Sequence, residues 1–181
     1  MTTITPCLVT DVPWQAFASG SDYATRFQDL AAHVGASRIS VSHEILEPGK
    51  TGTGSHYHTM NEEHVLILEG EAVLLLGDKR MDLVAGSYVC FPAGERQGHA
   101  LRNESVRPCR YLAIGCPHPS DLVIFPDENR VVVKALQASF PLDSELSSWN
   151  HLLNAGGTRP AEKLGAPTTI DLPIRQSGGD D

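Results

Sequence analysis

Hydrophobic and polar residues alternate along residues 37–46. One face carries mainly hydrophobic residues and the other polar ones: Ile39, Val41, His43 and Ile45 against Arg38, Ser40, Ser42 and Glu44. Successive side chains of a strand point to opposite faces, so this alternation predicts a half-buried strand that ends at Pro48 and Gly49. Further strands are predicted over residues 63–68, 71–76, 80–84, 87–91, 99–103, 110–115, 122–125 and 130–134. Many short strands separated by turn residues predict an all-β barrel or sandwich.

The composition is that of one compact folding unit. The chain has 181 residues, of which 41% are hydrophobic, which is enough for one core and short for two domains. The formal net charge is -8 and Lys and Arg form no cluster, which argues against nucleic acid as a partner. Residues 1–12 lack a basic start and an apolar run, and no stretch approaches the roughly 18 apolar residues that cross a bilayer. We therefore expect a cytoplasmic protein with no membrane partner.

The cysteines are scattered along the chain. Cys7, Cys90, Cys109 and Cys116 contain no Cys-x-x-Cys pair, which argues against a structural zinc site and against a secreted disulfide framework. We interpret Cys90 and Cys109 as small buried apolar residues within strands.

Four residues of metal-ligand type follow the first predicted strand. His56 and His58 are two positions apart, Glu63 opens the next predicted strand, and His99 opens a later one. Two imidazoles at i and i+2 on a strand share a face. If Glu63 and His99 face the same interior, the four side chains converge on one metal ion. Two histidines alone in a Gly-rich loop would be solvated surface residues, but the four residues together favour a metal site.

The surroundings of these residues resemble the two sequence motifs of the cupin superfamily. Residues 56–70 contain His-x-His, a short spacer, Glu63, six residues and Gly70, as in the first motif. Gly86, residues 92–94, His99 and Asn103 resemble the second motif, and the two motifs are specific as a pair. The chain resembles a group of small single-domain bacterial cupins that is largely uncharacterised. The resemblance implies a double-stranded β-helix, the jelly-roll cupin barrel, with short flanking helical segments.

One departure from the second motif concerns the fourth ligand. The usual motif has its histidine three residues after the glycine, where this chain has Gln97, and His99 lies two residues later. Three residues separate His99 from Asn103, as the motif requires, so we interpret two extra residues in the turn, with Gly98 giving the backbone the freedom to absorb them. The alternative is a site of three protein ligands with Gln97 nearby. The spacing to Gly70 also selects Glu63 over Glu62, which we expect to point outward.

We divide the chain into an N-terminal arm at 1–36, a cupin barrel at 37–140 and a C-terminal extension at 141–181.

Residues 22–34 leave two alternatives open. Hydrophobic residues recur at helical spacing between an N-cap at Asp22 and a stop at Gly35, whereas the resemblance favours an extended chain. Residues 144–154 predict a short amphipathic helix, and residues 178–181 a disordered tail. The apolar face of the helix must pack on the barrel or on a partner subunit, and we predict a homodimer.

The ligand set decides the chemistry that we expect. Three imidazoles and one carboxylate leave open positions on an ion such as Fe, Mn, Ni, Co or Zn, and catalysis requires an open site. We therefore predict a metal-dependent enzyme that acts on a small oxygen-rich organic molecule, as a dioxygenase or as a non-redox lyase or isomerase. The alternative is a cupin that binds a metabolite without turning it over, as a sensor or accessory subunit.

Three further residues are weaker candidates. His43 either lines the pocket as an acid or base or, the interpretation that we favour, is a core histidine held by a hydrogen bond. His64 has the opposite strand parity from Glu63, so we interpret it as a packing or surface residue. Arg102 faces away from His99 by the same parity, which favours a solvated arginine over a substrate-binding one.

Overall fold

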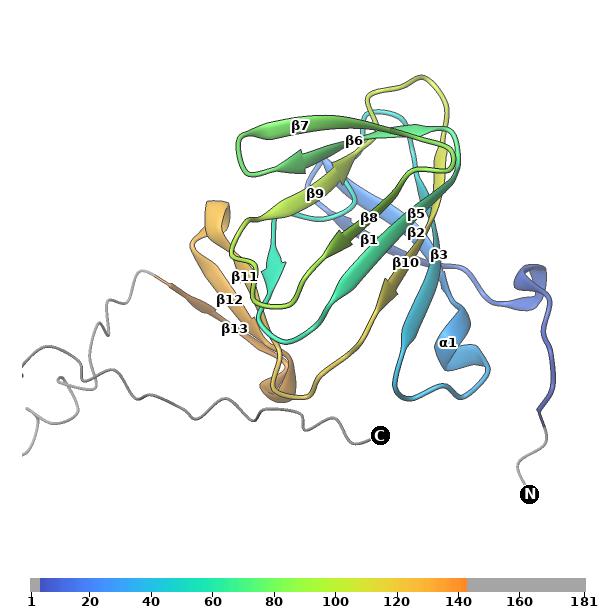
Figure 1. The fold of residues 1–181 in the computed structure, drawn as a ribbon, viewed down its shortest axis with the longest axis horizontal. Helices are drawn as coiled ribbons and strands as arrows, with labels where there is room; N and C mark the ends of the chain where they lie inside the picture. Colours follow the sequence, from blue (N-terminus) through green and yellow to red (C-terminus); the bar gives the residue numbers. More distant parts are fainter. Residues whose placement is uncertain (1–3, 143–181) are drawn as a thin grey trace, which may run out of the picture. The chain divides into compact units, whose positions relative to one another are not determined.

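The computed structural model describes residues 4–142, which form a predominantly β fold (Figure 1). The strands are β1 (Gln15–Ser19), β2 (Tyr23–Asp29), β3 (Ser40–Leu46), β4 (Tyr57–His58), β5 (Glu63–Glu69), β6 (Glu71–Leu76), β7 (Lys79–Val84), β8 (Tyr88–Phe91), β9 (His99–Arg102), β10 (Cys109–Gly115), β11 (Leu122–Phe125), β12 (Arg130–Val133) and β13 (Ala138–Pro141). Helical structure in this part of the chain is limited to the short helix α1 (Leu30–His33) and the 3-10 turns Val9–Asp11, Pro126–Glu128 and Lys134–Leu136.

The strands make the two walls of a jelly roll. One wall is a six-stranded sheet in the order β1-β2-β3-β10-β5-β8. The other combines a four-stranded sheet, β13-β12-β11-β4, with a three-stranded sheet, β7-β6-β9. An antiparallel bridge between His56 and His99 joins these two shorter sheets, so the residues flanking β4 lie beside β9 (Figure 1).

The hydrophobic core fills one end of the space between the walls. Leu46 at the end of β3, Ile67 on β5, Leu74 on β6 and Cys109 at the start of β10 are almost completely buried there. Burying each large aliphatic side chain contributes roughly 1.5–3 kcal/mol. The opposite ends of β3, β5 and β10 line a cavity instead, and that end of the fold holds the candidate site.

All the strands predicted from alternation and turn residues are present, with ends shifted by up to three residues. Residues 22–34, which the sequence left open, are mostly extended: β2 pairs with β1 on one side and β3 on the other. Helix α1 begins only after Asp29, whose Oδ1 accepts a hydrogen bond from Ala32 N at 2.9 Å. Sheet pairing on both edges supplies hydrogen-bond partners for the backbone N–H and C=O groups of β2. This pairing outweighs the helical spacing of its hydrophobic residues.

The two cysteines that we expected to be buried differ. Cys109 is fully buried, but Cys90 is exposed, so the interpretation of Cys90 as a core residue is wrong. Cys90 is on β8, an edge strand of the six-stranded sheet, and lies opposite His64 on β5. Both residues point away from the interior. Strand membership alone does not bury a side chain, because every second residue of a strand faces outward.

The predicted helix over residues 144–154 and the predicted tail lie outside the described residues. The homodimer that we attributed to that helix therefore stays a prediction, as do the boundaries of the three chain segments. Over residues 4–142, none of the helices has the length and apolar character needed to span a bilayer.

Candidate metal centre

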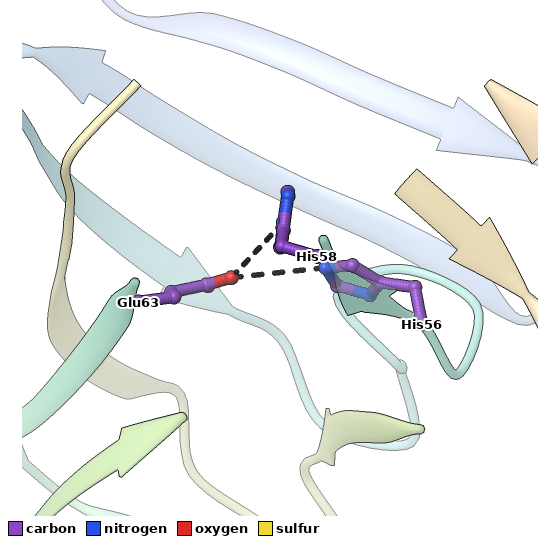
Figure 2. Close-up of side chains that lie close together, drawn as sticks. All are labelled: His56, His58 and Glu63. Atoms are coloured by element: carbon purple, nitrogen blue, oxygen red, sulfur yellow. Dashed lines mark ion pairs between the residues drawn. The ribbon is translucent and has the colours of Figure 1, made fainter. Parts of the chain in front are cut away.

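Four side chains converge at the open end of the jelly roll. His56 lies just before β4, His58 ends β4, Glu63 opens β5 and His99 opens β9. The Nε2 atoms of the three histidines lie 3.8, 3.4 and 3.5 Å from Glu63 Oε2, in chain order. Figure 2 shows the Glu63 carboxylate pointing toward the rings of His56 and His58, and the ligand atoms of these three residues lie within 4.8 Å of one another. The structure thus brings together the residues that the sequence singled out, which we call the His/Glu cluster.

Hydrogen bonds on the far side of two rings orient them toward the cluster. His56 Nδ1 lies 2.9 Å from the carbonyl oxygen of Gly54, and His58 Nδ1 lies 2.6 Å from Asp121 Oδ2. An imidazole that donates its Nδ1 proton keeps the lone pair of Nε2 free for a metal ion. Both rings are therefore held in the tautomer that a metal ligand needs.

His99 supplies an independent test of whether the cluster fits a metal ion. Its Nε2 is buried and has no hydrogen-bond partner among the described residues. A buried polar atom without a partner costs free energy, and nearly all such atoms in folded proteins are satisfied. A divalent ion among the three Nε2 atoms and the Glu63 carboxylate would satisfy this nitrogen. The residues present therefore fit a metal ion.

The pKa shifts of Glu63 and His99 suit the same ion. Burial alone would raise the pKa of the Glu63 carboxyl, but the three imidazoles that face it lower this pKa well below its ordinary value. Burial lowers the pKa of the His99 ring, which favours its neutral form. An ionised carboxylate and neutral imidazoles are the forms that bind metal ions.

Asp121 is a residue of the candidate site that sequence reasoning missed. Its carboxylate is buried, holds His58 Nδ1, accepts a hydrogen bond from Met60 N at 2.9 Å and lies 3.0 Å from Lys134 Nζ. Burial alone would raise the pKa of Asp121, but the bonds from His58, Met60 and Lys134 outweigh it and hold this pKa well below its ordinary value. Asp121 is 63 positions from His58, and no motif spacing marks a partner that distant.

The turn before His99 places Gln97 outside the cluster. Gln97 packs against Gly77, and its Nε2 lies 3.5 Å from the carbonyl oxygen of Leu76. Within the turn, Gly94 adopts a positive φ of 79°, whereas Gly98 does not have a positive φ. A Cβ on Gly98 would lie 2.5 Å from Ser55 Oγ. Gly98 therefore permits a close approach of two segments, rather than the special backbone conformation that we expected of it.

The weaker candidates lie outside the cluster. His43 Nδ1 is 2.8 Å from Gln28 Oε1 on the face of β3 away from the cavity, so the expected hydrogen bond is present, but the ring is half-buried and lies outside the core. His64 Nε2 lies 3.0 Å from Glu62 Oε1 on the outer surface, so Glu62 points outward as expected. Arg102 donates a hydrogen bond to Thr51 Oγ1 at 3.0 Å.

A cavity of about 450 Å³ lies against the His/Glu cluster. Cavities of a few hundred Å³ are the usual size of small-molecule sites. The lining combines the cluster with aromatic, hydroxyl and acidic side chains, among them Phe17, Phe27, Ser42, Glu44 and Asn61. The six-stranded sheet supplies many of these residues, so the wall opposite the histidines forms the surface that a ligand would contact.

Comparison with known proteins identifies a domain within the chain. Residues 42–115 match the family model described as the cupin domain. A search of curated proteins gives no match.

Solved structures with the same architecture include three with different described activities. A sugar phosphate isomerase of the cupin superfamily from Silicibacter pomeroyi has 23% sequence identity and a TM-score of 0.70, over 77% of this chain and 94% of its own. The polyketide cyclase RemF from Streptomyces resistomycificus has 24% identity and a TM-score of 0.54, over 66% and 84% of the two chains. A predicted oxalate decarboxylase from Thermotoga maritima has 19% identity and a TM-score of 0.55, over 63% and 100%. At these identities the likeness establishes the fold.

Proposed function

We propose that this cupin is a metal-dependent enzyme that acts on a small oxygen-rich organic molecule. His56, His58, Glu63 and His99 hold one divalent transition metal ion, and the adjoining cavity receives the substrate. The observation that carries this proposal is the buried Nε2 of His99, which has no hydrogen-bond partner within residues 4–142 and lies beside two imidazoles whose Nδ1 atoms are already hydrogen-bonded.

The donor set defines what a bound ion would supply. A first-row ion with three imidazoles and one carboxylate keeps open positions, at which it polarises substrate oxygen atoms or, as iron, supports oxidation by dioxygen. The chain's own residues bind and orient the substrate. Asp121 fixes the ring of His58, and the reciprocal backbone bonds of His56 and His99 hold these two residues side by side. The surrounding apolar side chains of Phe91 and Val65 limit the access of water.

Among reaction classes, we favour the non-redox branch, a lyase or isomerase, over the dioxygenase. The three structural neighbours are described as an isomerase, a cyclase and a decarboxylase. The cavity also places polar side chains, Ser42, Glu44 and Tyr111, within the same space as the cluster, and such groups position or exchange protons in non-redox reactions.

Elemental analysis of the full chain, purified without added metal, tests the metal assignment. We expect one divalent transition metal ion per chain, and we expect a folded His58→Ala variant to lose most of it. His33→Ala is the matched control, because His33 is exposed at the end of α1 and away from the cluster. Equal metal content in wild type and in folded His58→Ala, judged by circular dichroism, would overturn the proposal.

A further inference from the structure

The cavity beside the His/Glu cluster has an unusual charge pattern. Three carboxylates line it, those of Asp29, Glu44 and Glu63, and its lining contains no Lys or Arg within the described part of the chain. Burial raises the pKa of the Glu44 carboxyl. When all three carboxyls are ionised, a divalent ion at the cluster would offset two of the charges and leave one negative charge. Sites that bind phosphate or carboxylate groups are usually built from Arg, Lys and backbone N–H groups. This lining therefore disfavours an anionic ligand.

Glu44 is held in the cavity wall by three hydroxyl donors. Its Oε2 accepts hydrogen bonds from the Tyr111 hydroxyl at 2.7 Å and from Thr25 Oγ1 at 3.3 Å, and its Oε1 accepts one from Ser42 Oγ at 2.7 Å. These donors come from β10, β2 and β3, so the carboxylate is fixed by three neighbouring strands. Each carboxylate oxygen has more than one acceptor site. Glu44 can therefore accept further hydrogen bonds from a ligand without changing its position.

Asn61 provides a second, independent indication of a ligand. Its side chain is 7% exposed and lines the same cavity, and its Oδ1 has no hydrogen-bond partner among residues 4–142. A buried amide of this kind costs free energy until a ligand or a water pairs with it. An amide offers both an acceptor and donors, which suits hydroxyl groups, because a hydroxyl also donates and accepts.

Aromatic side chains complete the cavity. Phe17 on β1 and Phe27 on β2 line it together with Glu44 and Asn61. Apolar walls with a small number of fixed polar groups are typical of sites for small organic ligands. The C–H faces of a polyhydroxy compound would pack on the aromatic rings while its hydroxyl groups meet the carboxylate and the amide.

We propose that this cavity binds an uncharged polyhydroxy compound, such as a small sugar or polyol, through Glu44 and Asn61, and that it rejects phosphate monoesters of the same compounds. This assignment rests on the proposed metal-dependent function, because it names the substrate class of that site. Rejection follows from like charge: the lining has no Lys or Arg, and a divalent ion would offset only two of its three carboxylates, so a net negative charge would face a phosphate dianion.

Ligand binding to the full, metal-loaded chain tests the proposal. The probes are glycerol, D-ribose and D-fructose, each beside its terminal phosphate monoester, measured by saturation-transfer NMR and calorimetry. We expect at least one uncharged probe to bind, and its phosphate monoester to bind at least about tenfold more weakly. A phosphate ester that binds as tightly as its parent compound, or the failure of all three uncharged probes to bind, overturns the proposal.

Two variants test whether Glu44 and Asn61 cause the preference for uncharged probes over their phosphate esters. Glu44→Gln keeps the shape but removes the charge, so we expect the uncharged probe to bind about tenfold more weakly and the discrimination against its phosphate ester to shrink. Asn61→Ala, as a second variant, should weaken binding of the uncharged probe as well. Glu47→Gln is the matched control, because Glu47 pairs with Arg26 on the surface and should bind as wild type does. Unchanged binding in both folded cavity variants overturns the assignment.

Metal content, measured on the same samples, separates this proposal from the proposed function. A chain that holds its metal but binds no uncharged probe contradicts the cavity assignment alone. A chain that binds an uncharged probe through Glu44 but holds no metal supports the cavity assignment and contradicts the metal-dependent function.

Discussion

His56 and His99 exchange both of their backbone hydrogen bonds: His56 N donates to His99 O at 3.1 Å, and His99 N donates to His56 O at 2.9 Å. Residues directly opposite each other in an antiparallel pair have their side chains on the same face. The two imidazole centroids are accordingly 4.7 Å apart. The position of one proposed ligand is therefore fixed by the backbone of another, and the length of the turn before His99 does not decide it.

This pairing predicts the identity of the fourth ligand. His99→Ala should weaken metal binding by at least about 100-fold, since the loss of a direct ligand should cost no less than the loss of a partner behind one. Gln97→Ala should leave metal affinity unchanged, because Gln97 packs against Gly77 instead. Competition with a metal chelator measures both affinities. If only Gln97→Ala weakens metal binding, the ligand position of the second motif belongs to Gln97 and not to His99.

The contact between Asp121 and His58 predicts a smaller loss of metal affinity when Asp121 is replaced. In Asp121→Asn the side-chain amide no longer offers His58 Nδ1 a charged acceptor, so the ring loses its preferred orientation. We expect metal affinity to fall by about 10–100-fold, the usual cost of removing a partner behind a metal-binding histidine. Asp127→Asn serves as the control, because Asp127 is exposed in the turn after β11. Wild-type affinity in Asp121→Asn would remove Asp121 from the site.

The sequence predicted the elements with local signals well. Alternation and turn residues located β3 and β5 to β12, and the two motifs located the four residues of the His/Glu cluster. Each of these signals depends on neighbours within a few positions, such as the i and i+2 pair of His56 and His58. For the same reason β1 and β13 were missed, since their residues lack a clean alternation and both strands lie at sheet edges.

The cavity wall could not be predicted in the same way. Alternation along β3 separates Ser42 and Glu44 from His43 and Ile45, but it does not say which face lies inside. In the structure the polar face lines the cavity, while the other face is covered: Ile45 is buried, and His43 bonds Gln28, whose amide donates to the carbonyl oxygens of Val9 and Val12. A ligand cavity reverses the usual rule that the polar face of a strand meets solvent.

The cysteines differ in exposure, and their reactivity should follow. Cys109 is fully buried, and burial raises the pKa of its thiol to about 11. Thiolates react with disulfide reagents and thiols do not, so Cys109 should stay unmodified in the folded chain at mildly alkaline pH. Cys7, Cys90 and Cys116 are exposed. Ellman's reagent should therefore titrate three thiols in the native protein and all four in denaturant. Four reactive thiols in the native protein would contradict the buried position of Cys109.

Gly70 and Gly86 provide a matched pair for a stability prediction, because both adopt a positive φ, of 78° and 91°. An alanine at either position pays roughly 1–2 kcal/mol for the left-handed backbone conformation. A Cβ at Gly86 would meet nothing within 4 Å, whereas a Cβ at Gly70 would lie 2.7 Å from the carbonyl oxygen of Pro108. Urea unfolding should therefore show that Gly70→Ala lowers the free energy of unfolding by more than Gly86→Ala does. Equal losses would mean that the strand ends near Pro108 move apart at no cost, contrary to the close packing of β5 and β10 in the structure.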